Sequence, residues 1–210
     1  IAVATKAMNA GIDIIGVQSD RFPSMVNALK QSDLPYGPST IADGIAVRHA
    51  GRLTREIVAR LVTDILLVRE GDIKESVLAL LDVEKTVVEG AGAVGLAALL
   101  RNRERFAGKR VGVVLSGGNI DPLALTEIVA RGLVRSRRLA RIRVGLRDVP
   151  GSLAAVSAII ATANANIVEV HHQRAFTRLP AQNADVELVI QTRGPAHLQE
   201  TLDALARGGY

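Results

Sequence analysis

Residues 110–121 constrain the fold more than any other stretch, because an apolar run there meets a small polar loop and a helix start. Residues 111–115 are continuously apolar, which predicts a strand buried on both faces, as in a parallel sheet. The loop at 116–119 reads Ser-Gly-Gly-Asn, and Asp121 with Pro122 predicts the N-cap and first turn of a helix. Open α/β sheets bind their ligands beyond the carboxyl ends of strands, so we predict that this loop binds a ligand.

Upstream of this loop, helices alternate with short apolar strands, which predicts an α/β domain with a largely parallel sheet. The predicted helices are residues 1–9, 24–30, 54–63 and a helix capped by Asp72 that runs to 81, and the predicted strands are 12–18 and 64–68. Residues 31–43 form a long irregular stretch, and loops of this length are often functional. Gly44 follows it and permits either a close backbone approach or an ordinary turn.

The sequence Gly-Ala-Gly-Ala-Val-Gly at 90–95 has the G-x-G-x-x-G spacing of dinucleotide-binding loops. Such a site also needs an acidic residue about twenty positions later to hold a ribose. Residues 115–117 stand there instead and read Leu-Ser-Gly. We therefore interpret the glycines as a small-residue helix start packed against the sheet. Glu89 precedes this helix, where a carboxylate is favourable for capping alone.

After Arg138 apolar and polar residues alternate, which is typical of half-buried antiparallel strands. Three strands and two amphipathic helices follow in the order β-α-β-β-α, the ferredoxin-like pattern. The strands are predicted at 141–146, 167–174 and 185–192, the helices at 153–163 and from 195 onward, and a polar loop containing Pro180 at 176–184. The predicted boundary near Arg137 gives domains 1–137 and 138–210. Both ends of the chain read as cut, so we expect a fragment whose final strand is lost.

Composition narrows the classes of function. The 210 residues include no cysteine, which excludes disulfides and thiolate metal sites and suits a reducing cytoplasm. No segment approaches the length of a membrane span, so we predict a cytoplasmic protein without a membrane partner. The net charge of +5 is concentrated at 131–143, but no aromatic residues interleave with those arginines, so we predict no nucleic-acid partner.

Three motifs resemble the threonine dehydratase (threonine ammonia-lyase) family of fold type II pyridoxal-phosphate enzymes. They are Thr-Ile-Ala-Asp-Gly at 40–44, Val-Glu-Gly-Ala-Gly-Ala at 88–93 and Leu-Ser-Gly-Gly-Asn-Ile at 115–120. The second domain, with Asp-Val-Pro-Gly at 148–151 and Ala-Asn-Ile-Val-Glu-Val at 165–170, resembles an ACT regulatory domain. The resemblance covers essentially the whole chain.

By this resemblance Ser116 hydrogen-bonds the pyridine nitrogen of pyridoxal 5'-phosphate. Gly117 keeps the loop clear of the ring, Gly44 lies beside the ring, and Glu89 approaches from the turn. The implied reaction is α,β-elimination of threonine, or of serine, to a 2-oxo acid (2-oxobutanoate from threonine) and ammonia. The expected protein is a homo-oligomer, and isoleucine biosynthesis is one expected role. Its amino-acid substrate and an isoleucine or valine effector are its expected small-molecule partners.

Two elements of the family are missing. The lysine that forms the Schiff base, in a Ser-x-Lys setting, has no counterpart among the five lysines, and the glycine-rich phosphate loop is also absent. We therefore assign no catalytic residue and expect residues 1–210 alone to be inactive. Some relatives bind a divalent cation through a glutamate where this chain has Gln18, so we predict no metal ligand.

In the second domain, the resemblance assigns effector binding to Asp148, Pro150, Gly151 and Asn166, because amides at a helix start can receive a carboxylate. A helix cap and hairpin without any ligand explain the same residues equally well. A rival function is an amino-acid-sensing regulatory protein built on a degenerate catalytic domain. A dinucleotide-dependent oxidoreductase is a third reading, and it lacks a ribose-binding acid.

Overall fold

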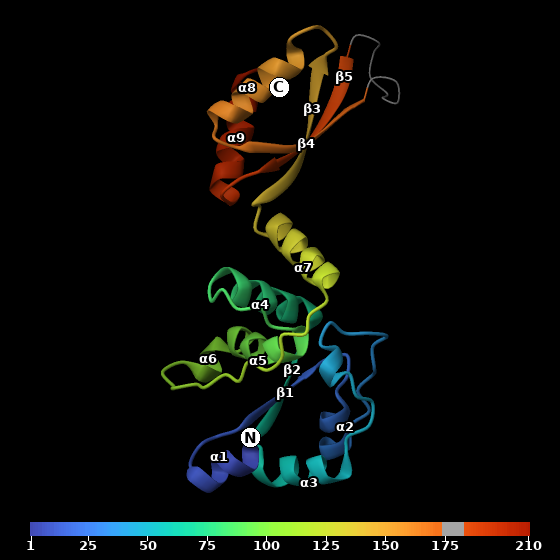
Figure 1. The fold of residues 1–210 in the computed structure, drawn as a ribbon, viewed down its shortest axis with the longest axis vertical. Helices are drawn as coiled ribbons and strands as arrows, with labels where there is room; N and C mark the ends of the chain where they lie inside the picture. Colours follow the sequence, from blue (N-terminus) through green and yellow to red (C-terminus); the bar gives the residue numbers. More distant parts are fainter. Residues whose placement is uncertain (174–182) are drawn as a thin grey trace. The chain divides into compact units, whose positions relative to one another are not determined.

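The computed structural model describes residues 1–173 and 183–210, and the chain divides into two compact units, 1–128 and 129–210 (Figure 1). The division falls within a helix, and the domain boundary near Arg137 stays a prediction. Among the described residues, no helix is both long and apolar enough to cross a membrane.

Unit 1 is built on a parallel pair of strands, β1 (Ile15–Ser19) and β2 (Asp64–Val68). The register aligns Ile15 with Asp64 and Ser19 with Val68, so both carboxyl ends lie at the same edge. The predicted α/β class and parallel pairing are therefore confirmed. Its helices are α1 (Ala2–Met8), α2 (Ser24–Lys30), η1 (Asp43–Ile45), α3 (Arg52–Leu61), α4 (Glu70–Asp82), α5 (Gly90–Arg101) and α6 (Arg103–Phe106). Helix α7 (Pro122–Arg135) contains the division between the two units.

Helix α4 begins at Glu70 with Arg69 as its N-cap, three residues earlier than predicted from Asp72 as the cap. The Asp72 carboxylate accepts a hydrogen bond from the Arg69 backbone N–H at 3.2 Å, so Asp72 occupies the third helical position and reaches back to the cap. Its apolar face contributes Ile73, Val77 and Leu80 to the core, opposite the small residues of α5. At α7 the prediction holds, since Asp121 Oδ1 accepts the Leu123 N–H at 2.6 Å.

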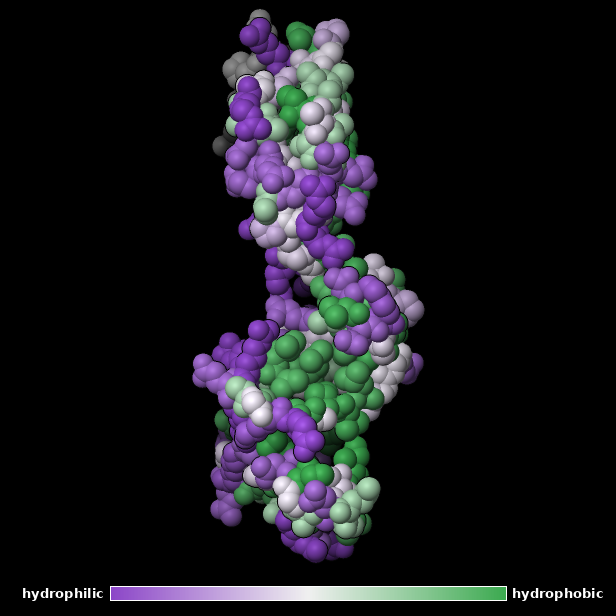
Figure 2. Space-filling model, turned by 90° about the vertical axis from the view of Figure 1, so that its left-hand side faces the viewer, coloured by the Kyte–Doolittle hydropathy of each residue, from purple (hydrophilic) through white to green (hydrophobic). Residues whose placement is uncertain are grey.

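The prediction of a strand at 111–115 is wrong. The segment has no strand pairing, and Val111, Val114 and Leu115 are between 42% and 56% exposed. A strand needs a neighbouring backbone for its hydrogen bonds, and here the segment runs beside helix α5 instead. A Cβ built on Gly95 would lie 3.0 Å from Val113 Cγ1. Apolar side chains are widely exposed on unit 1 (Figure 2).

Unit 2 has the predicted β-α-β-β-α order. Its elements are β3 (Leu139–Arg147), α8 (Ser152–Thr162), β4 (Asn166–Gln173), β5 (Asn183–Gln191) and α9 (Pro195–Arg207). The sheet is antiparallel in the order β3-β5-β4, and alternate residues of β3 and β5 pack with α8 and α9 in one core. The predicted loop around Pro180 lies almost wholly outside the described residues.

Candidate functional site

The amino end of helix α5 is where the three motifs of unit 1 meet. The Glu89 backbone N–H donates to the Gly117 carbonyl at 3.2 Å, which fixes the 116–119 loop over the first turn of the helix. Gly117 has φ of +78°, and a Cβ built there would lie 2.2 Å from Glu89 Oε1. Only glycine fits this position, because the conformation is left-handed and the space is already filled by a carboxylate.

The glycines at 90–95 serve packing rather than nucleotide binding. A Cβ built on Gly92 would lie 1.8 Å from the Ser116 carbonyl oxygen, and one built on Gly90 would lie 2.4 Å from the Ile41 carbonyl oxygen. Helix α5 therefore touches two backbone segments at its first turn. The interpretation of these glycines as a close-packed helix start is confirmed, although their neighbours are loops rather than a strand.

Gly44 reaches the same place from the short helix η1. A Cβ built on Gly44 would lie 3.2 Å from the Ala91 Cβ and 3.7 Å from Glu89 Oε1. Gly44, Glu89 and Gly117 are thus brought together, with Ser116 adjacent. Ser116 is exposed, and no hydrogen bond occupies its hydroxyl within 1–173 and 183–210. The result is a half-buried carboxylate, a free hydroxyl and two positions without side chains.

A residue that the sequence did not single out lies beside this group. The Glu70 carboxylate, at the first position of α4, accepts hydrogen bonds from the Thr40 hydroxyl and, at 3.1 Å, from the Ile41 backbone N–H. The helix dipole alone explains an acidic residue in the first turn of a helix. The position of Glu70 in the sequence therefore gives no reason to predict a contact with a loop thirty residues upstream.

Gln18 is fully occupied by protein contacts. Its amide nitrogen donates to the Phe22 carbonyl and lies within hydrogen-bond distance of Ser24 Oγ, both at 3.3 Å. Its Oε1 accepts the backbone N–H groups of Met25 and Val26, both at 3.1 Å. Within the described part of the chain, no three histidine, aspartate or glutamate side chains are grouped to hold a metal.

The residues assigned to effector binding do not form one cluster. Asp148, Pro150 and Gly151 lie in the turn after β3, where Gly151 has φ of +93° and precedes α8. Asn166 pairs with Gln191, whereas Arg147 pairs with Asn183. These pairs lie eight residues apart along β5, about 27 Å.

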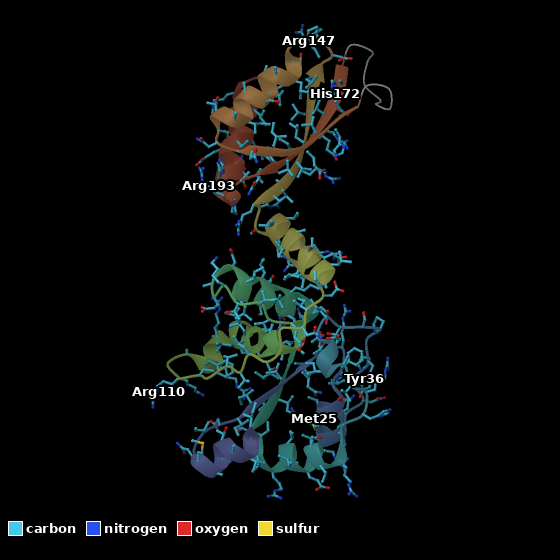
Figure 3. The ribbon with its side chains drawn as sticks, viewed as in Figure 1. Met25, Tyr36, Arg110, Arg147, His172 and Arg193 are labelled. Carbon is cyan, nitrogen blue, oxygen red and sulfur yellow. The ribbon has the colours of Figure 1, made fainter. Side chains whose placement is uncertain are left out.

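Figure 3 shows Arg147 and Arg193 at the two ends of this sheet. Asn166 therefore does not face the 148–151 turn within one chain, contrary to the expectation of a shared site. The separation follows from the antiparallel register, which no local motif encodes.

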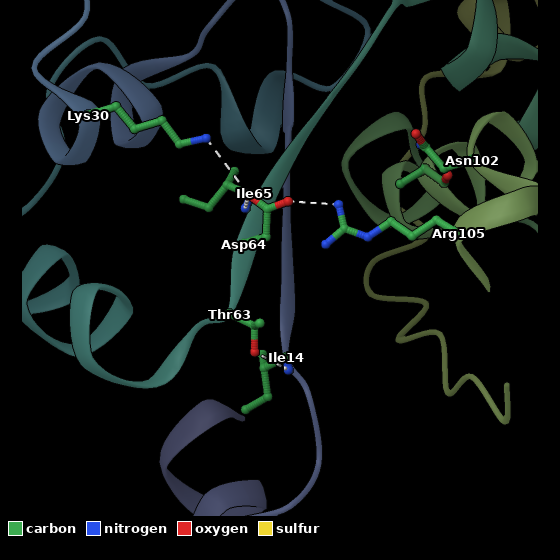
Figure 4. Close-up of polar contacts among 8 residues, drawn as sticks. Ile14, Lys30, Thr63, Asp64, Ile65, Asn102 and Arg105 are labelled. Carbon is green, nitrogen blue, oxygen red and sulfur yellow. Dashed lines mark hydrogen bonds and ion pairs between the residues drawn. The ribbon is translucent and has the colours of Figure 1, made fainter.

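In unit 1, Asp64 at the amino end of β2 forms ion pairs with two basic side chains. The Asp64 carboxylate accepts a hydrogen bond from Arg105 at 2.7 Å, and Lys30 Nζ lies 3.8 Å away (Figure 4). The Arg105 hydrogen bond is the largest cause of the lowered pKa of Asp64. Burial opposes it, while the Ile65 backbone N–H and the charges of Arg105 and Lys30 lower the pKa further. This triad joins α2, β2 and α6 and is structural.

Comparison with known proteins identifies both units. Residues 1–117 match the family model described as pyridoxal-phosphate dependent enzyme, and residues 140–207 match the ACT domain model. The L-threonine ammonia-lyases of Thermotoga maritima and Geobacter sulfurreducens are each 40% identical over 212 residues, covering 100% of this chain and 53% of the relative. The chain thus spans about half the length of the curated relatives that it matches.

Solved structures agree with this assignment. A crystal structure of a threonine deaminase from a source abbreviated T.th. is 31% identical and matches with a TM-score of 0.52, over 57% of this chain and 40% of that one. The resemblance seen in the three motifs is confirmed by these relatives. The chain therefore belongs to the pyridoxal-phosphate dependent enzyme family and carries an ACT domain after the part that matches that family.

Proposed function

We propose that the protein carrying this chain is a pyridoxal-phosphate-dependent L-threonine ammonia-lyase that converts L-threonine to 2-oxobutanoate and ammonia. One observation carries the proposal. In a chain of this family, Gly44, Glu89 and the Ser116–Gly117 backbone meet at the amino end of α5. The names of the curated relatives support threonine as the substrate.

The residues present fit the cofactor. Gly44 and Gly117 bring only backbone beside the Glu89 carboxylate, and the exposed Ser116 hydroxyl offers one neutral donor. Pyridoxal phosphate, when bound, supplies a conjugated ring that withdraws electron density from the α-carbon of the amino acid. A serine hydroxyl is too weak an acid to hold the pyridine nitrogen protonated. Ser116 therefore keeps this electron demand milder than a carboxylate partner would, which favours prompt loss of the β-hydroxyl.

The Schiff-base lysine has no assigned position within residues 1–210. We propose that the rest of the protein supplies it, and that residues 1–210 alone are inactive. We further propose that the protein is a cytoplasmic homo-oligomer and that isoleucine or valine regulates it through the ACT domain. The match of residues 140–207 to the ACT model supports such amino-acid binding.

Ser116→Ala in the complete protein tests the role of the hydroxyl. Losing one hydrogen bond worth about 1.4 kcal/mol lowers kcat/KM for threonine roughly tenfold. The measurement is the steady-state production of 2-oxobutanoate at saturating pyridoxal phosphate. Ser136→Ala is the matched control, because that hydroxyl bonds only within helix α7 and its following turn. Equal activity in both variants would show that the Ser116 hydroxyl does not contribute to the reaction.

A regulatory protein on a degenerate catalytic domain is the second candidate, favoured by the ACT match alone. Calorimetry of the complete protein separates the two functions. Titrations with isoleucine, valine and threonine are compared with and without pyridoxal phosphate. Uptake of the cofactor together with turnover of threonine supports the enzyme. Effector binding by a protein that never takes up the cofactor supports the sensor.

A further inference from the structure

A carboxylate outside the three motifs holds one of them in place. Glu70 binds residues 40 and 41 with both carboxylate oxygens: Oε1 accepts the Thr40 side-chain hydroxyl, and Oε2 accepts the Ile41 backbone N–H at 3.1 Å. Glu70 is the first residue of α4 and lies two residues after Val68, the last residue of β2. Its backbone position is therefore fixed by both a strand and a helix.

The Thr40 side chain extends this contact in two directions. Its Oγ1 accepts the Ala42 N–H at 3.2 Å, and it lies 3.3 Å from the Oγ of Ser19. Ser19 is fully buried at the end of β1. Thr40 thus connects the ends of β1 and β2 to the irregular loop, and the side chains of Ser19, Thr40 and Glu70 all have partners.

The segment that Glu70 holds is the one that contacts α5. The Ile41 carbonyl oxygen packs so tightly against Gly90 that a Cβ there would lie 2.4 Å away, and Ala42 is fully buried. Two residues later, Gly44 lies beside Ala91 and Glu89. A shift of the 40–42 backbone would therefore move Gly44 relative to the amino end of α5.

We propose that Glu70 is a positioning residue for the cofactor site. Through Thr40 and Ile41 it sets the distance between Gly44 and the Glu89–Gly90 turn, and so the width of the space open to the pyridoxal ring. The inference rests on the proposed cofactor site, but Glu70 itself touches neither cofactor nor substrate. A carboxylate is required because one amide oxygen cannot replace two acceptor oxygens.

Glu70→Gln in the complete protein tests the proposal, because it preserves size and removes one acceptor and the charge. Glu56→Gln on the exposed surface of α3 is the control, since no hydrogen bond or ion pair of its side chain is found in the described chain. The hydrogen bonds that Glu70 and Thr40 accept from residues 40–42 form a clamp on this loop. Amide hydrogen exchange of the protein without cofactor measures this clamp directly. We expect Glu70→Gln to raise exchange at the Ile41 and Ala42 amides at least tenfold, and Glu56→Gln to change neither.

Cofactor affinity then separates positioning from mere stability. We expect the Kd for pyridoxal phosphate to rise about tenfold in Glu70→Gln at temperatures far below its Tm. Thr40→Val should reproduce this loss and Thr40→Ser, which keeps the hydroxyl, should restore it. This pair also serves if Glu70→Gln does not fold.

Unchanged exchange at Ile41 would overturn the clamp. Raised exchange with an unchanged Kd would show that the clamp does not set the cofactor site, and would overturn the proposal while leaving the enzyme function intact. A wild-type protein that binds no pyridoxal phosphate would refute the proposed function itself, and the positioning role would fall with it.

Discussion

Glu89 and Gly117 occupy adjoining space, and each limits what the other position can hold. The carboxylate fills the volume where a side chain at 117 would begin, and the Glu89 N–H holds the Gly117 carbonyl. The single contact between Glu89 and residue 117 therefore explains why a glycine follows Ser116. It also means that the loop cannot tighten onto the helix without displacing the carboxylate.

Gly117→Ala should destabilise the protein and weaken cofactor binding. The left-handed conformation costs a non-glycine residue about 1–2 kcal/mol, and the added Cβ must also push Glu89 aside. Gly108→Ala is an informative control, because Gly108 has φ of +70° but no heavy atom within 4 Å of its built Cβ. Chemical denaturation and pyridoxal phosphate titration of both variants give the two quantities. If Gly108→Ala weakened the cofactor equally, the contact with Glu89 would be irrelevant.

Sequence patterns identify the site residues unevenly. Gly44, Glu89, Ser116 and Gly117 were assigned through family resemblance, and the structure shows them close together, although their roles stay predictions. Glu70 was missed because its partners, Thr40 and Ile41, are thirty residues away, and a helix-capping acid has the same local appearance. Local patterns report periodicity and caps, whereas a long-range clamp leaves no trace in them.

At the scale of elements, the helix start at Asp121 is predicted correctly, whereas the starts of α3 and α4 lie two and three residues before the predicted ones and the strand at 111–115 is absent. An N-cap such as Asp121 acts within three residues, so the sequence contains both partners. A buried strand instead requires a neighbouring strand, and an apolar run alone cannot supply one. The run at 111–115 lies beside α5 and keeps much of its apolar surface exposed.

The triad at Asp64 joins three elements and should make stability depend on pH. The pKa of Asp64 lies below its ordinary value of 3.8 in the folded chain, so its contribution is complete above that value and is lost as the pH falls through the lowered pKa. At neutral pH, Asp64→Asn should lower the free energy of unfolding by about 0.5–1 kcal/mol, since the three side chains are partly exposed. Below the lowered pKa the difference from wild type should vanish.

Urea denaturation at a series of pH values measures this difference. Asp33→Asn serves as the control, because no hydrogen bond or ion pair of this exposed carboxylate is found in the described chain. Added salt should shrink the effect of Asp64→Asn, because partly exposed charges are screened. A difference that is constant from neutral to acid pH would show that the charge of Asp64 contributes nothing.

At the scale of the whole molecule, each unit has its own core. The core of unit 2 contains residues of β3, β4, β5, α8 and α9 and none from unit 1. The order of its elements was predicted correctly because alternation and helical periodicity are local properties. The separation of Asn166 from the 148–151 turn was not predicted, because it depends on the register of the whole sheet.

Residues 136–210 should fold alone, since this piece retains the hydrogen bonds of Thr192 to the Arg137 and Arg138 carbonyls. Circular dichroism should show one cooperative thermal transition. Within this piece Leu188→Ala, at a fully buried position, should cost about 2–5 kcal/mol. Leu202→Ala, at a position 36% exposed, should cost much less. A gradual transition, or equal effects of both substitutions, would contradict an independent core.

The contact between Gly92 and Ser116 has a consequence for engineering. A Cβ at 92 would fall 1.8 Å from the Ser116 carbonyl oxygen. The loop can therefore lie this close to α5 only because residue 92 has no side chain. Any larger residue at 92 would have to displace the Ser116 backbone, which the hydrogen bond from the Glu89 N–H to the Gly117 carbonyl holds close to the helix. Redesign of this site must therefore keep glycine at 92 and change the residues around it.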